Sequence, residues 1–332
     1  MREPAYWWRR PGIIAGLLFP FGLIYGAIAA RRLTMKGTPA RMAVLCVGNF
    51  TLGGAGKTPT VMMLAQMLAD AGQRPFCLTR GYGGTVAGPR LVDVHKDAAA
   101  QVGDEALLLA RIAPTVVARD RVAGAAFAAA QGASVIVMDD GLQNPSLMKD
   151  LTLAVVDARR GVGNGYVFPA GPLRAPLAAQ LVKTDALLVV GNGSGADHVI
   201  AEVRARGLPI FRGLLRPDSA GLSALKGRAV LAFAGIGDPE KFFASAVEAG
   251  IAVAERRSFD DHHCYTAEEA AELIMQAEHS GLALLTTEKD RARMTGEPLL
   301  GALATRAHPL RVSMTVEDTD ELRKLVLSKL KR

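Results

Sequence analysis

A glycine-rich segment at residues 51–58 constrains the fold of this chain more than any other feature of its sequence. It reads TLGGAGKT, which matches the pattern G-x-x-x-x-G-K-[ST] except that Thr51 stands at the first glycine. An apolar run at residues 42–47 precedes it, and residues 59–71 follow with helical periodicity. In such a strand–loop–helix unit, successive backbone N–H groups and the positive end of the helix bind phosphate.

The predicted site binds a nucleoside triphosphate and a metal ion. Lys57 is expected to reach the β- and γ-phosphates, and the Thr58 hydroxyl to bind Mg²⁺. Asp139 ends an apolar strand at 134–138, where a second Mg²⁺ ligand is expected. For the loop, the alternative is a glycine-rich turn without a ligand. For Asp139, the alternative is an acidic turn at a strand end. We assign triphosphate binding to the whole segment, which comprises Thr51, Leu52, Gly53, Gly54, Ala55, Gly56, Lys57 and Thr58.

Short apolar runs alternate with helical patterns along most of the chain. This alternation is typical of an α/β fold in which helices cover both faces of a parallel sheet. The pattern loosens around residues 214–226, and further strands and helices begin at Ala229. We therefore expect a phosphate-loop domain over residues 37–223 and a smaller α/β domain over residues 224–332.

Residues 1–36 form a distinct apolar and basic segment. Residues 11–30 carry no charge, and six basic side chains against one acidic side chain give the segment +5 of the total of +7. Tyr, Trp and Trp at 6–8 suit a lipid headgroup layer, whereas Pro20 is expected to break or kink a helix. We expect association with a membrane surface. A helix or helical hairpin in the leaflet, a true span and packing on the protein's own core are the alternatives, and a cleaved signal peptide is less favoured.

Charge and cysteine content argue against two classes of protein. Because the basic excess lies in residues 1–36, the rest of the chain lacks the basic surface of a nucleic-acid-binding protein. Cys46, Cys77 and Cys264 are too far apart in the sequence for a C-x-x-C zinc motif, and a disulfide framework is not expected. A reducing cytoplasmic setting fits, and the sequence indicates no obligate protein partner.

Two polar motifs could act on an acceptor group. Asp104 begins a helical pattern, where it would cap the helix, or orient and deprotonate an attacking hydroxyl, or both. His262 follows Asp260 and Asp261, which suits an acid/base or electrostatic role better than a metal site. The two aspartates could equally cap the helix expected from Ala267.

Six arginines lie in loops or directly after apolar runs, where ligands of α/β proteins bind. Their planar guanidinium groups suit phosphate, so we expect some of them to contact phosphate groups. A solvated surface position is the alternative for each. They are Arg80, Arg119, Arg121, Arg159, Arg160 and Arg174.

Seven short motifs occur in order along the chain. They are VGN at 47–49 with GGAGKTP at 53–59, LTRGYG at 78–83, VGDE at 102–105, DDGLQ at 139–143, PAGPLR at 169–174, DH at 261–262 and TEKD at 287–290. Together with the apolar N-terminus they resemble the tetraacyldisaccharide 4′-kinases, also called lipid A 4′-kinases. The resemblance extends over residues 1 to about 295.

The resemblance implies a P-loop NTPase-like fold and a reaction. ATP would phosphorylate the 4′-hydroxyl of a tetraacylated glucosamine disaccharide 1-phosphate, with Mg²⁺, to give lipid IVA in lipid A biosynthesis. The enzyme would act at the cytoplasmic face of the inner membrane of a Gram-negative bacterium. It would be held there as a peripheral or monotopic protein by residues 1–36.

The resemblance also implies roles for individual residues. Asp104 would pair with His262 to activate the sugar hydroxyl, and Lys57 would stabilise the transferring phosphate. Thr58 and Asp139 would serve the metal. The positions near the substrate or nucleotide would be Tyr82, Arg121, Asp140, Asn144 and Arg174, with Arg119 close to Arg121 in sequence. The chain departs from the family pattern at Ala175, where glutamate is usual, and at Asp260, where proline is frequent.

Two other functions stay open on the residues alone. One is a P-loop kinase for a soluble acceptor. The other is a membrane-associated NTPase switch. TEKD at 287–290 partly matches the N-K-x-D motif that reads guanine, with glutamate in place of asparagine.

Overall fold

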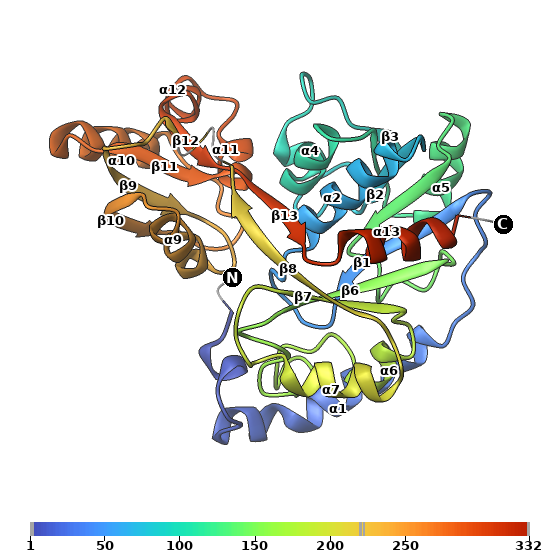
Figure 1. The fold of residues 1–332 in the computed structure, drawn as a ribbon. Coiled ribbons are helices and arrows are strands. Elements are labelled where there is room, and N and C mark those ends of the chain that lie inside the picture. The colour runs from blue at the N-terminus through green and yellow to red at the C-terminus, as the bar shows by residue number, and fades with distance from the viewer. Residues whose placement is uncertain (1–2, 219–220, 222, 331–332) are drawn as a thin grey trace.

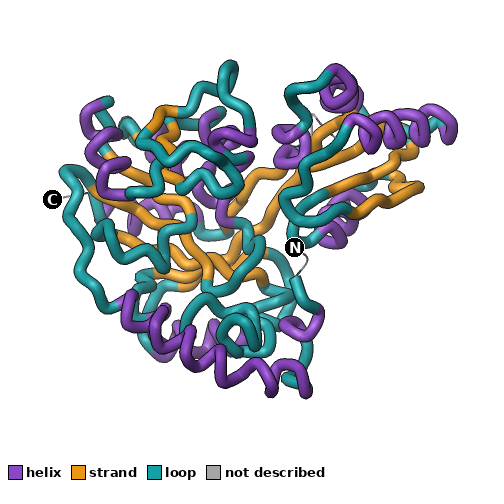
Figure 2. Tube along the Cα trace, turned by 180° about the vertical axis from the view of Figure 1, so that it is seen from behind, coloured by secondary structure: helices purple, strands orange, loops and turns teal. Residues whose placement is uncertain are grey.

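The computed structural model describes residues 3–218, 221 and 223–330, and it contains two separate β-sheets (Figure 1). Residues 1–2 of the expected membrane segment and residues 331–332 of the expected second domain lie outside the described residues. Seen from behind, the strands again form two groups, each with helices beside it (Figure 2).

The larger sheet forms the body of the protein. All neighbouring strands in it run parallel except the two edge pairs, β13 with β8 and β3 with β4. Among the described residues its nine strands lie in the order β13 (Val312–Val316), β8 (Ile210–Pro217), β7 (Ala186–Val190), β6 (Leu151–Asp157), β1 (Ala43–Asn49), β5 (Val135–Asp139), β2 (Pro75–Thr79), β4 (Thr115–Val117) and β3 (Arg90–Leu91).

Helices cover both faces of this sheet, as predicted, because its strands are apolar on both sides. In β1, Leu45 and Val47 pack on one face, and Val44 and Cys46 pack on the other. The first face is covered by α2 (Lys57–Asp70), α4 (Asp104–Ala110) and α13 (Thr319–Ser328). The second is covered by α5 (Arg121–Ala130), α6 (Leu177–Leu181) and α7 (Asp197–Ala205), while α3 (Ala99–Val102) packs beside α4.

The smaller sheet is entirely parallel in its described pairings, with the strand order β10 (Ala252–Ser258), β9 (Ala229–Ala234), β11 (Ala283–Thr287) and β12 (Ala307–Leu310). Its helices are α9 (Pro239–Glu248), α10 (Ala267–Ser280), α11 (Glu288–Arg293) and α12 (Pro298–Arg306). We call the larger sheet with the helices that cover it the first unit, and residues 229–310 the second unit.

The last part of the chain corrects the expected extent of the second domain. We expected residues 224–332 to form one C-terminal unit, but β13 pairs antiparallel with β8 in the larger sheet. Leu322 and Val326 of α13 then pack in the core of that sheet. The prediction is therefore wrong for residues 312–328, because pairing with β8 and burial of apolar residues against α2 return the chain to the first unit.

The apolar N-terminal segment begins with a short 3-10 helix, η1 (Ala5–Trp8), and continues as a single helix, α1 (Ile13–Leu33). Pro20 lies inside α1, so the expected break at this residue does not occur. A buried face formed by Ala15, Gly22 and Gly26 packs on the protein, with Gly22 close to the carbonyl of Val167. The opposite face of α1 exposes large apolar side chains.

Gly48, near the end of β1, provides space for the loop that follows β5. A Cβ atom added at Gly48 would lie 2.5 Å from the Cβ of Leu142 and 3.1 Å from its backbone nitrogen. We expect Gly48→Ala to lower the free energy of unfolding by about 1–3 kcal/mol. Urea unfolding measures this. In the control Gly301→Ala the new Cβ meets no atom within 4 Å, so an equal loss in both variants contradicts the prediction.

Candidate active site

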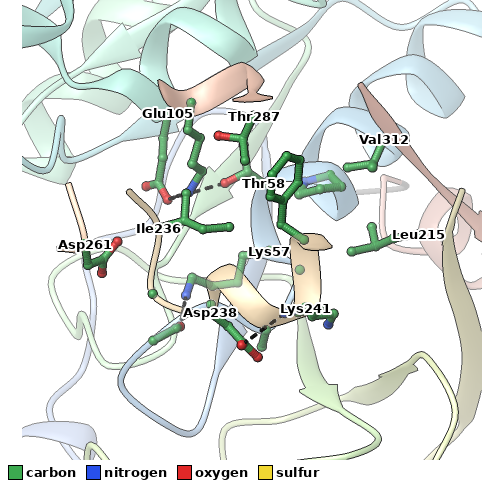
Figure 3. A pocket seen from close by; sticks show the side chains of 18 of the residues that line it. Lys57, Thr58, Glu105, Leu215, Ile236, Asp238, Lys241, Asp261, Thr287 and Val312 are labelled. Atoms are coloured by element: carbon green, nitrogen blue, oxygen red, sulfur yellow. Dashed lines mark hydrogen bonds and ion pairs between the residues drawn. The ribbon is translucent and has the colours of Figure 1, made fainter. Parts of the chain in front are cut away.

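A cavity of about 390 Å³ lies between the two units and is lined by residues from both (Figure 3). It lies where β1, β2 and β5 end, which is the edge of a parallel sheet at which α/β proteins bind ligands. Its walls also include Leu215 of β8, Val312 of β13 and residues of α9 and α11. The volume falls in the range of small-molecule sites, roughly 300–1,000 Å³.

The glycine-rich loop forms one wall of this cavity. Residues 52–58 line it, whereas Thr51 is buried behind it. Gly53 and Gly56 have φ values of 96° and 95°, which side chains other than glycine rarely adopt. The loop thereby turns directly into α2, whose N-terminus starts at Lys57. The predicted strand–loop–helix unit is present with its backbone arranged around the cavity.

Lys57 points across this loop. Its Nζ donates a hydrogen bond to Asn49 Oδ1 at 3.1 Å and lies 3.8 Å from Asp140 Oδ1. Burial lowers the pKa of Lys57, and the charge of Asp140 opposes that shift. The ammonium group is therefore held by weak, replaceable partners beside the place where phosphate groups would lie.

Asp140 and Arg174 form an ion pair that is bonded to the start of the glycine-rich loop. Arg174 Nη1 donates to both oxygens of Asp140, at 2.8 and 2.9 Å, and its Nε donates to the carbonyl of Thr51 at 2.8 Å. Burial opposes ionisation of Asp140, but the charges of Lys57 and Arg174 outweigh it and lower its pKa to about 2. Both side chains line the cavity, as expected for residues near a substrate or nucleotide.

Asp139 is buried beneath the loop. Neither of its carboxylate oxygens has a hydrogen-bond partner among the described residues. Burial, with the charges of Glu105 and Asp140, raises its pKa to about 7. A buried carboxylate that lacks a partner is costly unless a cation or donor arrives with the ligand. This is the observation that fits Asp139 to a metal ion.

Glu105 joins Asp139 and Thr58 at this point, although our sequence analysis did not assign it a role. Thr58 Oγ1 donates to Glu105 Oε1 at 3.5 Å. The described residues contain no group of three or more His, Cys, Asp or Glu side chains that could hold a metal alone. Mg²⁺ at phosphate sites needs fewer protein ligands, because it uses one or two carboxylates with phosphate oxygens and water. The donor set therefore fits Mg²⁺ bound together with a triphosphate.

Asp104 and His262 lie together, as the resemblance implied. The distance between Asp104 Oδ2 and His262 Nδ1 is 3.4 Å, and the ring of Tyr82 packs on His262 with centroids 4.9 Å apart. Tyr82 and His262 line the cavity, whereas Asp104 is buried just behind it. Burial opposes ionisation of Asp104, but the hydrogen bond with His262 and the charges of Lys289 and Arg293 outweigh it and lower its pKa.

The capping alternatives for these motifs are wrong. Gly103 is the N-cap of α4, and Asp104 is the first residue inside the helix, where its Oδ1 accepts a hydrogen bond from the Glu105 N–H. Thr266, not Asp260 or Asp261, caps α10. Asp104 is thus not the N-cap of α4, and neither Asp260 nor Asp261 is the N-cap of α10.

Helix α11 supplies two basic residues that our sequence analysis missed. Lys289 Nζ lies 2.6 Å from Glu105 Oε1, and Arg293 Nε donates to Asp104 Oδ2 at 2.9 Å. The two residues are four positions apart and so share one face of the helix. The available signal was the TEKD motif together with this spacing.

The structure around the start of α11 also argues against recognition of guanine by the TEKD motif. With Glu288 and Lys289 at the first two positions of N-K-x-D, Arg291 stands where the base-reading aspartate would be. Asp290 is fully buried and accepts hydrogen bonds from Gly235 N–H and Tyr265 Oη. Thr287 caps α11. The TEKD motif therefore forms the start of α11 and does not bind a base.

Three expected ligand residues lie outside the cavity. Arg121 is buried at the start of α5, where it donates to the carbonyl of Ala118. Asn144 Oδ1 accepts from Ser146 N–H at 2.9 Å and stabilises its own turn. Arg119 is exposed and only approaches the carbonyl of Gly84, at 3.5 Å. The structure does not bring these three to the cavity.

Of the arginines predicted to bind phosphate, one lines the cavity and two others lie at its rim. Arg174 lines the cavity, whereas Arg159 and Arg160 form ion pairs with Asp238 at the rim. Arg160 also pairs with Glu3 at 2.7 Å and stacks on Trp8, so the N-terminal segment contacts the two units here. These pairs explain the positions of Arg159 and Arg160 without a ligand.

Comparison with known proteins identifies the family. The model of the tetraacyldisaccharide-1-P 4′-kinase family matches residues 14–331. Tetraacyldisaccharide 4′-kinases of Rhodopseudomonas palustris (strain BisB5) and Methylobacterium sp. (strain 4-46) are 54% and 55% identical, covering 99% and 97% of this chain and 97% and 96% of their own lengths. A crystal structure of LpxK from Aquifex aeolicus in complex with ATP is 28% identical, with a TM-score of 0.75 over 96% of this chain and 100% of that chain. The phosphate loop, the Asp104–His262 pair and these matches agree, and the chain belongs to the tetraacyldisaccharide 4′-kinase family.

Proposed function

We propose that this protein transfers the γ-phosphate of ATP to the 4′-hydroxyl of a tetraacylated glucosamine disaccharide 1-phosphate, giving lipid IVA. One observation carries the proposal: a single cavity contains a phosphate loop on one side and, on the other, His262 paired with Asp104. Membership of the kinase family supports it, as does the ATP bound by the Aquifex aeolicus relative. Neither a soluble acceptor nor a nucleotide switch has comparable support.

The triphosphate fits the wall formed by residues 52–58. The loop N–H groups and Lys57 would hold the β- and γ-phosphates and stabilise charge that develops during transfer. Leu215, Leu310 and Val312 give the cavity an apolar side, which suits the nucleotide base. Thr58, Glu105 and Asp139 would hold Mg²⁺, which would neutralise charge on the phosphate oxygens when bound.

The acceptor hydroxyl would enter beside Tyr82 and His262. Asp104 would then orient this hydroxyl and accept its proton as the phosphoryl group is transferred. His262, at 3.4 Å from the same carboxylate oxygen, would hold the pair toward the substrate. Because burial excludes water from Asp104, the hydroxyl competes with little water for this base.

The N-terminal segment fits a role at the membrane. Among the described residues, α1 is the one helix long and apolar enough to cross a bilayer, and 17% of its most apolar window is buried in the protein. Its packing through Gly22 and Gly26 suits a helix that lies on the protein and in the leaflet at once. A lipid acceptor would stay in its bilayer, because each acyl CH₂ removed costs about 0.8 kcal/mol. We propose that the enzyme works at the cytoplasmic face of the inner membrane.

Direct transfer tests this function. γ-labelled ATP, Mg²⁺ and a tetraacyldisaccharide 1-phosphate are combined with the full chain in mixed micelles, and labelled lipid is measured. We expect label on the lipid at the 4′ position. Label that appears on a soluble sugar instead, or release of free phosphate at the full rate without any acceptor, would contradict the proposal.

Membrane binding has its own expected result. Leu17 and Ile24 are 71% and 64% exposed on the free face of α1. We expect the double variant Leu17→Asp/Ile24→Asp to bind anionic vesicles at least about tenfold more weakly, because two apolar side chains no longer enter the lipid. Vesicle co-sedimentation measures this. Met275→Asp, 60% exposed in the second unit, is the control, and an equal effect there would contradict the role of α1.

A further inference from the structure

Arg293 connects the second unit to Asp104. Its side chain is 6% exposed and that of Asp104 is 2% exposed. Arg293 Nε donates to Asp104 Oδ2 at 2.9 Å, and Nη2 of the same guanidinium donates to the same oxygen. A contact this well buried between charged groups is unusual, because each charge must be paired to offset its desolvation.

The guanidinium is itself held rigidly. Arg293 Nη1 donates to the carbonyl of Gly235 at 2.7 Å and to Asp290 Oδ1 at 3.1 Å. Asp290 in turn accepts from Gly235 N–H and Tyr265 Oη. Both sides of the planar group are thus occupied, so Arg293 presents its remaining donors in one fixed direction.

The Asp104 carboxylate has few other constraints. Its Oδ1 accepts from the N–H of Glu105 at 2.8 Å. Its Oδ2 is shared between Arg293 and His262, and the His262 distance of 3.4 Å is the longer one. The orientation of the carboxylate is therefore determined mainly by Arg293. Against the effect of burial, the hydrogen bond with His262 and the charge of Lys289 lower the pKa of Asp104, and the charge of Arg293, which does not line the cavity, adds to them.

We propose that Arg293 is a positioning residue that holds the Asp104 carboxylate in its reactive orientation and ionised form. This inference rests on the proposed function, because it assigns a task in hydroxyl activation. Arg293 does not line the cavity, so it acts through Asp104 and not on ATP. The second unit would then supply two residues that phosphoryl transfer requires, Arg293 and His262.

The test uses the full chain in mixed micelles with ATP and the tetraacyldisaccharide 1-phosphate. We expect Arg293→Met to lower kcat about 100-fold while KM for ATP changes less than about twofold. Arg293→Lys keeps a cation within reach of Asp104, so we expect it to recover at least about tenfold of that loss. Arg291→Met, on the same helix, is the matched control and should keep the kcat of the wild type.

Several results would overturn the role of Arg293. Arg293→Met with wild-type kcat, or Arg293→Lys no more active than Arg293→Met, overturns the inference. So does an equal rise in KM for ATP, since that indicates a general loss of structure. Thermal unfolding and binding of a fluorescent ATP analogue check that the variants are folded, and if Arg293→Met does not fold, the kcat of Arg293→Lys decides. A wild type that does not label the lipid overturns the proposed function and this inference with it.

Discussion

Asp104→Asn is expected to lower kcat about 10³-fold with little change in affinity for ATP. Asparagine has the shape of aspartate but lacks the charge that accepts a proton, and Arg293 and His262 would lose their anionic partner. The affinity should persist because Asp104 does not line the cavity. Steady-state kinetics with the lipid acceptor and binding of a fluorescent ATP analogue measure the two effects separately.

A matched buried aspartate makes the comparison specific. Asp97 has a fully buried side chain and pairs with Arg90 at the edge of the first unit. Asp97→Asn should alter stability but leave kcat within about twofold of the wild type, because it lies outside the cavity. If Asp104→Asn retains more than a tenth of wild-type kcat, the acceptor hydroxyl is activated by another group.

Lys57→Met is the second change with a large expected effect, a fall in kcat of about 10²–10³-fold. Methionine fills nearly the same space but cannot stabilise negative charge on the transferring phosphoryl group. The fold should tolerate the change, because Lys57 is 9% exposed and burial already disfavours its charge. We expect the melting temperature to stay the same or rise, while transfer of γ-label to lipid is lost.

Lys149 offers the control for this prediction. It is also largely buried, but its Nζ donates only to backbone carbonyls, including that of Leu142 at 3.4 Å. Lys149→Met should therefore retain kcat. A Lys57→Met variant with wild-type transfer would show that the loop N–H groups and the metal suffice without the ammonium group.

The local parts of the fold and site were predictable because local sequence determines them. Apolar runs predicted β1 and β5 within about two residues, and the loop at 51–58 could only connect a strand to a helix. Asp140 and Arg174 were expected near the ligand because the family resemblance implies it, and Arg174 also because it lies in a loop rich in glycine and proline. Their mutual pairing was not visible in the sequence, since 34 residues separate them.

The features that were missed depend on contacts between distant residues. The pairing of β8 with β13 joins segments about 100 residues apart, and nothing in either segment indicates its partner. Arg293 and Asp104 are separated by 189 residues, so the ion pair appears only once the two units meet. Pro20 was expected to break or kink a helix, and the break does not occur, because one lost backbone hydrogen bond does not end a helix of 21 residues that gains contacts along its buried face.

The β8–β13 pair is the place where the second unit joins the larger sheet. The chain leaves the larger sheet after Pro217 and returns at Val312, and these two residues are register partners. The Asp218 N–H donates to the Arg311 carbonyl at 2.9 Å just beyond them. The second unit is thus a module inserted at the tip of a hairpin, and its two ends are adjacent. Such a module can be exchanged between relatives, or can turn as a body on the hairpin, without altering the nucleotide loop beneath it.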